Sequence, residues 1–373
     1  MPKSNSPTKL LGLFPQFGNG HVGGIQESAR VAWQALSDHC ASELICYSRA
    51  EGPNSNRSRG DDSRARAILA AAKQNVSPDL VVVWQIGLLK LLPFLRYKNG
   101  ASTAVFLHGI EAWKEQSWLT RRLTGHINLF LCNSEYTWKR FCSFNPSLAA
   151  IPHKTVPLGL AAPATVKSSA PATPPAALML SRLSKTENYK GHREVIQAWP
   201  QVMQKHKDAQ LWIAGDGDQR RELEELAISQ RLGESIKFFG KVSEDKKHDL
   251  MEACRCLVMP SRGEGFGLVY LEAMRIGRPC LVSTVDAGRE VVNPPEAGLA
   301  ANPDDGEQLA DSLVRLLTDG PEWQQWSRQA RHRYESNYTA EHFQKRLLAA
   351  LFPDKVSSAD YADSAEKLKQ IIV

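Results

Sequence analysis

Short apolar runs alternate with amphipathic stretches along most of the chain, and this alternation limits the fold more than any other feature. In the first 160 residues the runs are rich in Val, Ile and Leu and do not alternate with polar residues. Continuous runs of this kind are typical of strands buried on both faces, and strands separated by helices form parallel sheets. The pattern therefore predicts an α/β protein. The predicted strands of this half are 10–14, 43–48, 80–85, 103–109, 127–134 and 154–160.

The segment AAPATVKSSAPATPPAA, residues 161–177, interrupts the alternation. Its Ala, Pro, Ser and Thr residues bury little surface, so we expect a linker. Afterwards the alternation resumes, and we expect two doubly wound, Rossmann-like domains, residues 1–160 and 178–351, facing each other across a cleft. A tail, 352–373, could pack back on the first domain. The second set of predicted strands is 177–183, 210–215, 236–242, 254–261 and 279–283.

Composition places the chain among ordinary globular proteins. Its 373 residues suit two domains, and 42% of them are apolar. No run approaches the roughly 20 apolar residues of a membrane span, and the first residues lack a long apolar signal region. The seven cysteines are scattered, odd in number and without a C-x-x-C pair. Reduced thiols in the cytoplasm are therefore favoured over disulfides or a metal site.

Charge is uneven along the chain. Residues 1–160 carry 18 Lys and Arg against 10 Asp and Glu, a balance of +8, whereas the remainder carries 28 against 30, a balance of −2. A basic front half favours an acidic ligand or an anionic membrane surface, but it lacks the dense basic runs of nucleic-acid-binding proteins. The segments 88–98 and 118–123 combine apolar and basic residues. They read as packed helices with basic caps or, alternatively, as membrane-surface patches.

A glycine pattern after the first strand raises the question of a dinucleotide site. Gly18, Gly20 and Gly23 spell G-x-G-x-x-G. In a nicotinamide-binding turn, however, the first glycine follows the strand at once and an acid closes the next strand. Here PQF intervenes and the second strand ends without an acid. We therefore interpret Gly18 and Gly20 as loop residues, and Gly23 with Gly24 as a helix start that admits an anion.

The segment PSRGEGFGLVYLEAM, residues 260–274, is the strongest local signal. It follows an apolar strand and opens a predicted helix at 268–276. Gly265 and Gly267 allow close backbone approach, which suits a phosphate. Glu264 and Glu272 make sense beside such a ligand if their carboxylates accept hydrogen bonds from sugar hydroxyls. The alternative is a plain helix start with a surface acid.

A basic loop follows the first strand of the second half. Arg182 ends the predicted strand, and Lys190 with Gly191 opens the next helix. Both cations then lie at the carboxyl edge of the sheet, where they would stabilise a departing diphosphate. A solvated basic surface is the alternative reading.

Taken together, these motifs closely resemble the retaining glycosyltransferases with the GT-B fold of glycosyltransferase family 4, the glycosyl transferases group 1. The likeness extends over nearly the whole chain, and the Glu264–x7–Glu272 spacing is its most specific part. The motifs that carry it are GGIQ (23–26), FLHGIE (106–111), CNSEYT (132–137), VPLGL (156–160), SRL…YKGH (181–192), LWIAGDGDQRRELEELA (211–227), FFGKVSE (238–244) and PSRGEGFGLVYLEAM (260–274).

The resemblance implies roles at the reacting end of a sugar-nucleotide donor. Arg182 and Lys190 match the pair that neutralises the diphosphate. Glu264 matches the acid beside the transferred sugar. His108 matches a histidine near the sugar, although a core histidine is its ordinary alternative at the end of a buried strand. The N–H groups of three residues match those that reach donor oxygens: Gly265, Phe266 and Gly267.

The remaining donor contacts are implied in the same way. Glu272 matches the carboxylate that grips the ribose, and Lys241 with Val242 matches the backbone beside the nucleobase. Gly23 and Gly24 match a loop that closes over the diphosphate. Independently of the resemblance, Gly215 sits in a turn after a strand, where it either lines the nucleotide end or serves as an ordinary turn residue. The long PQFGNGHV loop departs from the family pattern, so we expect the acceptor-binding side of this protein to differ from that of other family members.

The implied activity is transfer of a hexose, from GDP-mannose or a UDP-hexose, to an acceptor hydroxyl with retention of configuration. The acceptor would be a glycan, a glycolipid or a small glycoside, anionic or lipid-linked. No cofactor or metal is expected, because Asp61-Asp62 and Asp304-Asp305 lie in loops rather than at a fitting strand end. An epimerase or phosphorylase on the same fold, and a catalytically silent sugar-nucleotide-binding protein, remain alternatives.

Overall fold

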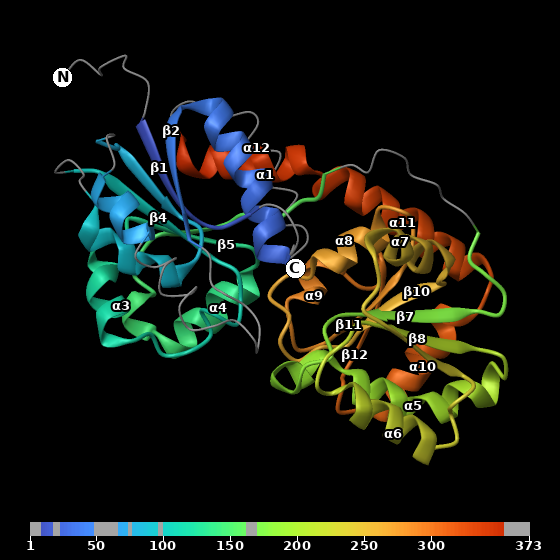
Figure 1. The fold of residues 1–373 in the computed structure, drawn as a ribbon. Coiled ribbons are helices and arrows are strands. Elements are labelled where there is room, and N and C mark those ends of the chain that lie inside the picture. Colours follow the sequence, from blue (N-terminus) through green and yellow to red (C-terminus); the bar gives the residue numbers. More distant parts are fainter. Residues whose placement is uncertain are drawn as a thin grey trace. The chain divides into compact units, whose positions relative to one another are not determined.

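The computed structural model describes residues 9–17, 23–47, 66–73, 77–95, 100–161 and 170–353. They form two compact units, one built from the chain up to Gly159 together with the segment from Ala340 onward, the other from Leu160–Thr339 (Figure 1). Gly18 and Gly20, residues 162–169 of the predicted linker and residues 354–373 of the predicted tail lie outside the described residues.

The first unit contains a parallel six-stranded sheet in the order β2-β1-β3-β4-β5-β6. The α/β prediction is therefore confirmed for this half. Its last strand ends at Thr155 rather than at residue 160, because Pro157 has no N–H to donate to a ladder. The strands are β1 (Lys9–Pro15), β2 (Ala41–Tyr47), β3 (Leu80–Val83), β4 (Ser102–Leu107), β5 (Leu129–Cys132) and β6 (His153–Thr155).

Helices cover this sheet, and aromatic side chains fill one side of its core. Trp84, which follows β3, is fully buried and stacks on Phe14 at 5.1 Å between ring centroids. Phe106 lies 4.4 Å from the same indole. Residues 66–73 are helical. The other helices are α1 (Gly24–His39), η1 (Ile86–Phe94), α3 (Trp118–Leu123), η2 (Thr124–His126), α4 (Glu135–Phe144), η3 (Pro146–Leu148) and α12 (Ala340–Leu351).

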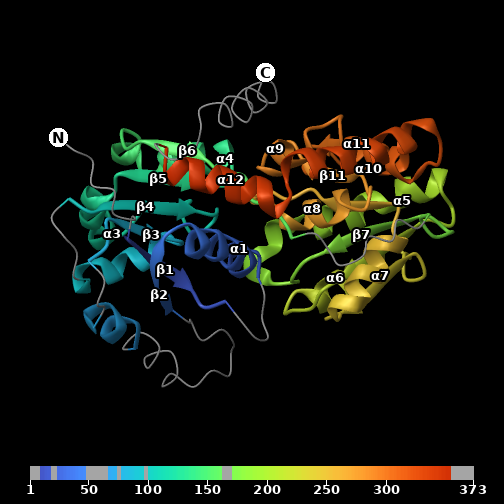
Figure 2. The ribbon, with the colours of Figure 1, turned by 90° about the horizontal axis from the view of Figure 1, so that it is seen from above.

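Helix α12 corrects the predicted domain boundary. Residues up to 351 were expected in the second domain, yet α12 belongs to the first unit, where it packs along α1 (Figure 2). Its buried Phe343 faces Trp84 at 6.2 Å, and Gln344 donates a hydrogen bond to the Val31 carbonyl at 3.4 Å. A buried apolar face decides where a helix packs. The chain therefore returns to the first unit at Ala340, before the predicted tail begins.

The second unit contains another parallel six-stranded sheet, ordered β12-β11-β10-β7-β8-β9. Five strands match the predicted runs. The sixth, β12, was not predicted, because GLAA lacks the β-branched residues that mark a strand. The strands are β7 (Ala176–Leu180), β8 (Gln210–Ala214), β9 (Ile236–Gly240), β10 (Cys256–Met259), β11 (Cys280–Ser283) and β12 (Gly298–Ala301).

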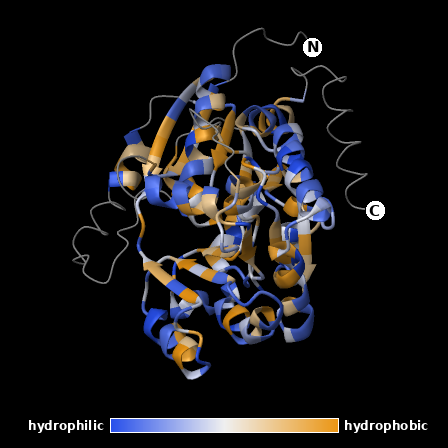
Figure 3. Cartoon of the chain, turned by 90° about the vertical axis from the view of Figure 1, so that its right-hand side faces the viewer, coloured by the Kyte–Doolittle hydropathy of each residue, from blue (hydrophilic) through white to orange (hydrophobic). Residues whose placement is uncertain are grey.

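Helices flank this second sheet, and hydrophobic residues concentrate on the strands (Figure 3). Helix α10 shows how such a helix forms and packs. Leu309, Leu313 and Leu316 recur at helical spacing and are buried. Asp305 caps the first turn by accepting the Gln308 N–H at 3.0 Å. The helices are η4 (Lys185–Lys190), α5 (His192–Lys205), α6 (Arg220–Ser229), α7 (Glu244–Ala253), α8 (Leu268–Met274), α9 (Gly288–Val292), α10 (Gly306–Leu317) and α11 (Pro321–Asn337).

Two further predictions concern the chain as a whole. Among the helices of the described ranges, none has the length and apolarity that crossing a bilayer requires. All seven cysteines lie in those ranges and none forms a disulfide.

Candidate functional site

The candidate site lies where the strand order of the second sheet reverses. Strands β7 and β10 are neighbours, and the chain leaves them toward opposite edges of the sheet. A crevice at the carboxyl ends of such strands is the usual ligand site of open α/β sheets. Two loops meet there, 181–191 after β7 and 260–267 after β10. The sequence placed both at this edge, and the structure confirms their contact: Arg262 N–H donates to the Tyr189 carbonyl at 2.8 Å.

Gly191 lets the two loops approach. Its φ is +86°, and a Cβ there would lie 2.6 Å from the Pro260 carbonyl oxygen. Only glycine fits this conformation and this spacing. The next residue, His192, is buried and lies 3.2 Å from Ser181 Oγ through Nε2. Burial and, to a lesser extent, the Lys190 charge lower the pKa of His192 to about 4, so this imidazole is neutral at physiological pH.

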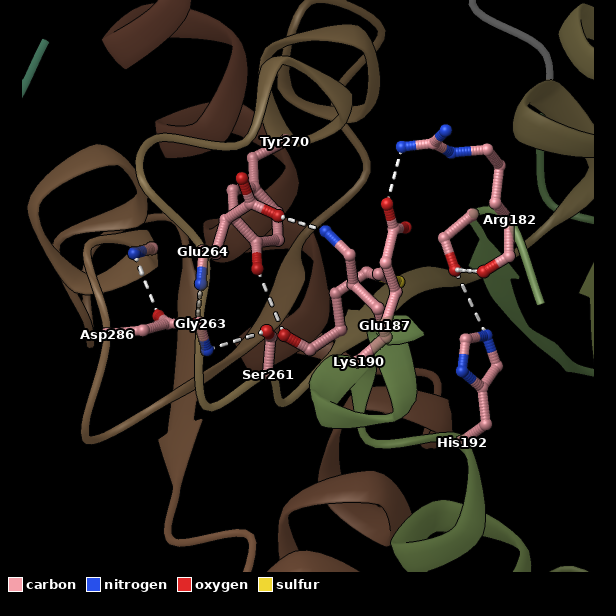
Figure 4. Close-up of polar contacts among 12 residues, drawn as sticks. Arg182, Glu187, Lys190, His192, Ser261, Gly263, Glu264, Tyr270 and Asp286 are labelled. Carbon is pink, nitrogen blue, oxygen red and sulfur yellow. Dashed lines mark hydrogen bonds and ion pairs between the residues drawn. The ribbon is translucent and has the colours of Figure 1, made fainter. Parts of the chain in front are cut away.

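Lys190 and Glu264 form the centre of the site (Figure 4). Lys190 Nζ lies 2.8 Å from Glu264 Oε2, and the two side chains are only 14% and 18% exposed. Burial alone would lower the pKa of Lys190, but the negative charge of Glu264 and its hydrogen bond outweigh burial and raise that pKa. The ammonium also lies 5.3 Å from the Tyr189 ring centroid. The site therefore holds a cation that stays charged.

Arg182 comes from the same loop but is held differently. Its side chain is 73% exposed and pairs with Glu187, not with Glu264 (Figure 4). An exposed ion pair contributes about 1 kcal/mol or less. A stronger anion can therefore draw the guanidinium away from Glu187 at little cost.

Asp286 is a buried acid that sequence reasoning missed. Its carboxylate accepts the Glu264 N–H at 3.3 Å and the Gly288 N–H at 2.9 Å, while Ala287 N–H donates to the Glu264 carbonyl at 3.1 Å. Burial and then the Glu264 charge raise the pKa of Asp286 well above its usual value. The segment after β11 thus fixes the backbone of Glu264 from both sides. The sequence shows a D-x-G turn pattern at residues 286–288, but it does not show that this turn packs against Glu264.

Helix α8 begins at the glycine-rich turn. Gly267 has a φ of +85°, and a Cβ there would lie 2.3 Å from the Tyr270 ring. The buried Phe266 packs edge-on against Tyr338 at 6.0 Å, so its side chain is a core anchor and only its backbone can reach a ligand. Gly265 is buried between Glu264 and Phe266. The helix ends at Met274, two residues before the predicted end, and so short a helix has a small dipole. Lys190, which contacts Glu264, therefore brings a full positive charge to this turn from the neighbouring loop.

Glu272 lies on α8 and is paired with a lysine that no sequence pattern indicated. Lys247 Nζ lies 3.3 Å from Glu272 Oε1 and 2.6 Å from Glu244 Oε2. Burial lowers the pKa of Lys247, but the two carboxylates outweigh burial and raise it. Glu272 thus presents its carboxylate beside a fixed positive charge.

The other predicted donor-binding residues of this unit lie at neighbouring strand ends. Gly215 has a φ of +144°, its N–H donates to the Gly240 carbonyl at 2.9 Å, and a Cβ would lie 1.8 Å from the Ser181 carbonyl oxygen. Close backbone packing by itself explains this glycine. Lys241 is exposed and Val242 half-buried in the loop between β9 and α7. Their contact with a nucleobase stays a prediction.

His108 belongs to the first unit, at the end of β4. Its ring is buried, stacks on Phe106 at 4.7 Å, and donates from Nε2 to the Trp84 carbonyl at 2.7 Å. Burial lowers the pKa of His108 to about 4. The imidazole is thus neutral at physiological pH and supplies no positive charge. Glu111 Oε1 holds the turn that follows, accepting the His108 N–H at 2.7 Å and the Gly109 N–H at 3.3 Å.

Gly23 and Gly24 open α1, as predicted. Gly23 is its N-cap and Gly24 its first residue, and both are exposed. The Gly23 carbonyl accepts the Glu27 N–H at 3.1 Å. Whether these glycines contact a diphosphate stays a prediction.

A metal site is not evident in the part of the chain that the structure describes, which holds no cluster of three His, Cys, Asp or Glu side chains. Asp304 pairs with Arg262 at 2.5 Å, and Asp305 caps α10. Asp61-Asp62 lies outside the described residues. Metal independence stays a prediction.

Comparison with known proteins finds a family match in the second unit. Residues 174–319 match the family model described as glycosyl transferases group 1. The match lies within the second unit and covers less than half of the chain. It is 30% identical over 222 residues to a GDP-mannose-dependent monoacylated alpha-(1-6)-phosphatidylinositol monomannoside mannosyltransferase of Corynebacterium glutamicum, covering 53% of this chain and 55% of that one. The first three curated relatives match over 33% to 58% of their own lengths.

Solved structures extend the likeness to the whole fold. The sucrose-phosphate synthase of Thermosynechococcus elongatus has a TM-score of 0.72 at 18% identity, covering 93% of this chain and 99% of that one. Anabaena HepE in complex with UDP-glucose has a TM-score of 0.70 at 18% identity, covering 92% and 99%. At such identities the likeness concerns the fold, which is GT-B. The predicted fold class is confirmed.

Proposed function

We propose that the protein transfers a hexose from a nucleotide diphosphate sugar to an acceptor hydroxyl, with retention of configuration and without a metal. One observation carries this proposal: the buried Lys190–Glu264 pair at the switch point between β7 and β10. A cation that stays charged suits a diphosphate, and an adjacent carboxylate suits sugar hydroxyls. The GDP-mannose-dependent relative and the UDP-glucose complex support this class of donor.

In the proposed reaction the bond between the anomeric carbon and the diphosphate oxygen breaks, and its electron pair leaves with the diphosphate. Lys190 stabilises that developing charge, joined by Arg182 once it leaves Glu187, and by N–H groups of the turn at 265–267. The acceptor oxygen bonds to the anomeric carbon on the face that the diphosphate vacates. A diphosphate oxygen takes the acceptor proton. Glu264 orients the sugar through its hydroxyls and Glu272 binds the ribose.

The proposal is tested by donor binding. We expect one of UDP-glucose, UDP-galactose and GDP-mannose to raise the melting temperature, because a ligand that binds only the folded state stabilises it. Glu272→Ala should weaken donor affinity by about tenfold or more, since a hydrogen bond to a charged group is lost, while kcat at saturating donor changes less. Titration calorimetry and initial rates measure the two effects.

The same assay separates the alternatives. NAD serves as the negative control, and unchanged donor affinity in Glu272→Ala would remove the ribose role. Conversion of the donor to a new sugar nucleotide without any acceptor indicates an epimerase. Donor binding without transfer or hydrolysis indicates a silent binding protein.

We further infer that the acceptor is anionic or lipid-linked, and that the first unit contacts the cytoplasmic face of a membrane. Within this unit η1 and α3 pack together and expose two aromatic side chains, Phe94 at 44% and Trp118 at 69%. Lys90, Arg121 and Arg122 are exposed on the same two helices. Arg121 pairs with Glu115 in an exposed ion pair. Exposed aromatic rings on helices that also expose cations favour an anionic lipid surface.

Vesicle binding checks this inference. The protein is expected to sediment with vesicles that contain phosphatidylglycerol and not with pure phosphatidylcholine, and added salt should release it. Trp118→Ser should lower the bound fraction severalfold. Ile228→Ser is the matched control, because Ile228 is also 69% exposed but lies on α6 of the second unit. Equal losses in the two variants would contradict a specific surface.

A further inference from the structure

Lys247 occupies an unusual position between two acids. It lies in the first turn of α7 and is 24% exposed, and its ammonium contacts Glu272 on α8 and Glu244 on its own helix. Glu272 is 21% exposed, whereas Glu244 is 87% exposed. The exposed pair contributes little, so the half-buried contact with Glu272 is the significant one.

The start of α7 places this lysine beside the loop that the family resemblance assigns to the nucleobase. Lys241 and Val242 precede the helix directly, and Ser243 caps it by accepting the Lys246 N–H at 3.2 Å. Glu272 reaches the same place from α8 after the glycine-rich turn. Two elements on either side of the expected nucleoside therefore contribute one cation and one anion.

The unused hydrogen-bonding capacity of the pair points to a ligand with adjacent hydroxyls. An ammonium has three N–H donors, and the contacts among the described residues use two of them. At Glu272 the ion pair engages Oε1, which leaves Oε2 as an acceptor. A ribose diol matches this arrangement, because one hydroxyl can donate to the carboxylate while its neighbour accepts from the ammonium.

We propose that Lys247 and Glu272 act together to bind the 2′,3′-diol of the donor ribose, with Lys247 as a specificity-determining residue. The inference rests on the proposed function and adds a second ribose contact to it. Because the ion pair engages Glu272 Oε1, Glu272 offers Oε2 to one hydroxyl and Lys247 offers its third N–H to the other. With Lys247 beside it, the site contacts both hydroxyls, and a deoxyribose leaves one donor or one acceptor of the half-buried pair without a hydroxyl to bind.

Binding of nucleoside diphosphates tests the proposal without any turnover. The probes are UDP and GDP, each compared with its 2′-deoxy and 3′-deoxy analogues by titration calorimetry. The wild-type protein is expected to prefer the ribose form of its nucleotide by about tenfold or more over at least one analogue, as expected for a lost charge-assisted hydrogen bond. Lys247→Met keeps the length of the side chain and should reduce that preference to about twofold to threefold.

Three further variants keep the test decisive. Lys246→Met is the matched control: it removes the same charge from the adjacent position, where the ammonium lies 5.9 Å from the Phe239 ring centroid, and should keep the full preference. Lys247→Arg retains a donor and should restore part of it. Lys247→Gln replaces Lys247→Met if the methionine variant melts early.

The outcomes separate this inference from the proposed function. If Lys247→Met binds UDP or GDP and still discriminates as the wild type does, the ribose role of Lys247 is refuted while the donor site stands. If the wild type binds neither nucleotide, the proposed function fails and this inference fails with it.

Discussion

We expect Lys190→Met to lower kcat by about a hundredfold to a thousandfold, because the loss of one fixed hydrogen-bond donor to a developing oxyanion has effects of that size. Methionine has a similar length, so packing against Tyr189 is largely kept. The substitution also leaves Glu264 without its cation and close to the buried Asp286. Donor affinity should therefore fall as well. Initial rates over a range of donor concentrations measure both effects.

The control for this prediction comes from the same loop. Lys185 is exposed at the start of η4, so Lys185→Met removes an equal charge away from the Glu264 contact. It should change kcat by less than about twofold. Melting curves of both variants show whether the fold is kept. A kcat of Lys190→Met close to that of the wild type would mean that another group carries the leaving-group charge.

The sequence predicted the neighbourhood of Lys190 and Glu264, and the reason is topological. The loops after β7 and β10 must meet, because the two strands are neighbours and both loops leave their carboxyl ends. A motif in each loop was therefore enough to bring these side chains together. The motifs do not show how exposed each side chain is or which residue it pairs with. Arg182 was expected beside the diphosphate together with Lys190, yet it is exposed and paired with Glu187.

Asp286 and Lys247 were missed for a different reason. Each acts on a predicted residue from a position outside the motifs, Asp286 in the turn after β11 and Lys247 in the first turn of α7. Such partners depend on how helices pack on the sheet rather than on local spacing. Helix α12 shows the same limit: the sequence placed residues up to 351 in the second domain and could not show which unit buries Phe343.

The second large effect concerns the stability of the second unit. Arg333 on α11 is only 2% exposed, and its guanidinium donates to the Val291 carbonyl at 2.7 Å and the Glu290 carbonyl at 2.9 Å. It also pairs with Glu296 at 2.8 Å. We expect Arg333→Met to lower the free energy of unfolding by about 3–5 kcal/mol, the range seen when one partner of a buried charged network is removed. Urea denaturation followed by circular dichroism measures the loss.

The effect should arise from the carbonyl groups that methionine cannot satisfy. Glu290 and Val291 lie in the last turn of α9, which ends at Val292, and the carbonyls of a last turn need partners from outside the helix. Arg333 donates to both carbonyls, and the Glu290 carbonyl also accepts a hydrogen bond from the Tyr338 hydroxyl. Arg221→Met is the control, because Arg221 is 90% exposed in its pair with Glu225, and it should cost less than about 1 kcal/mol. Arg333→Lys keeps a charge without the planar fork and should fall between the two. Equal stabilities of Arg333→Met and Arg221→Met would show that the buried network does not hold α9, the helix that follows the turn fixing Glu264.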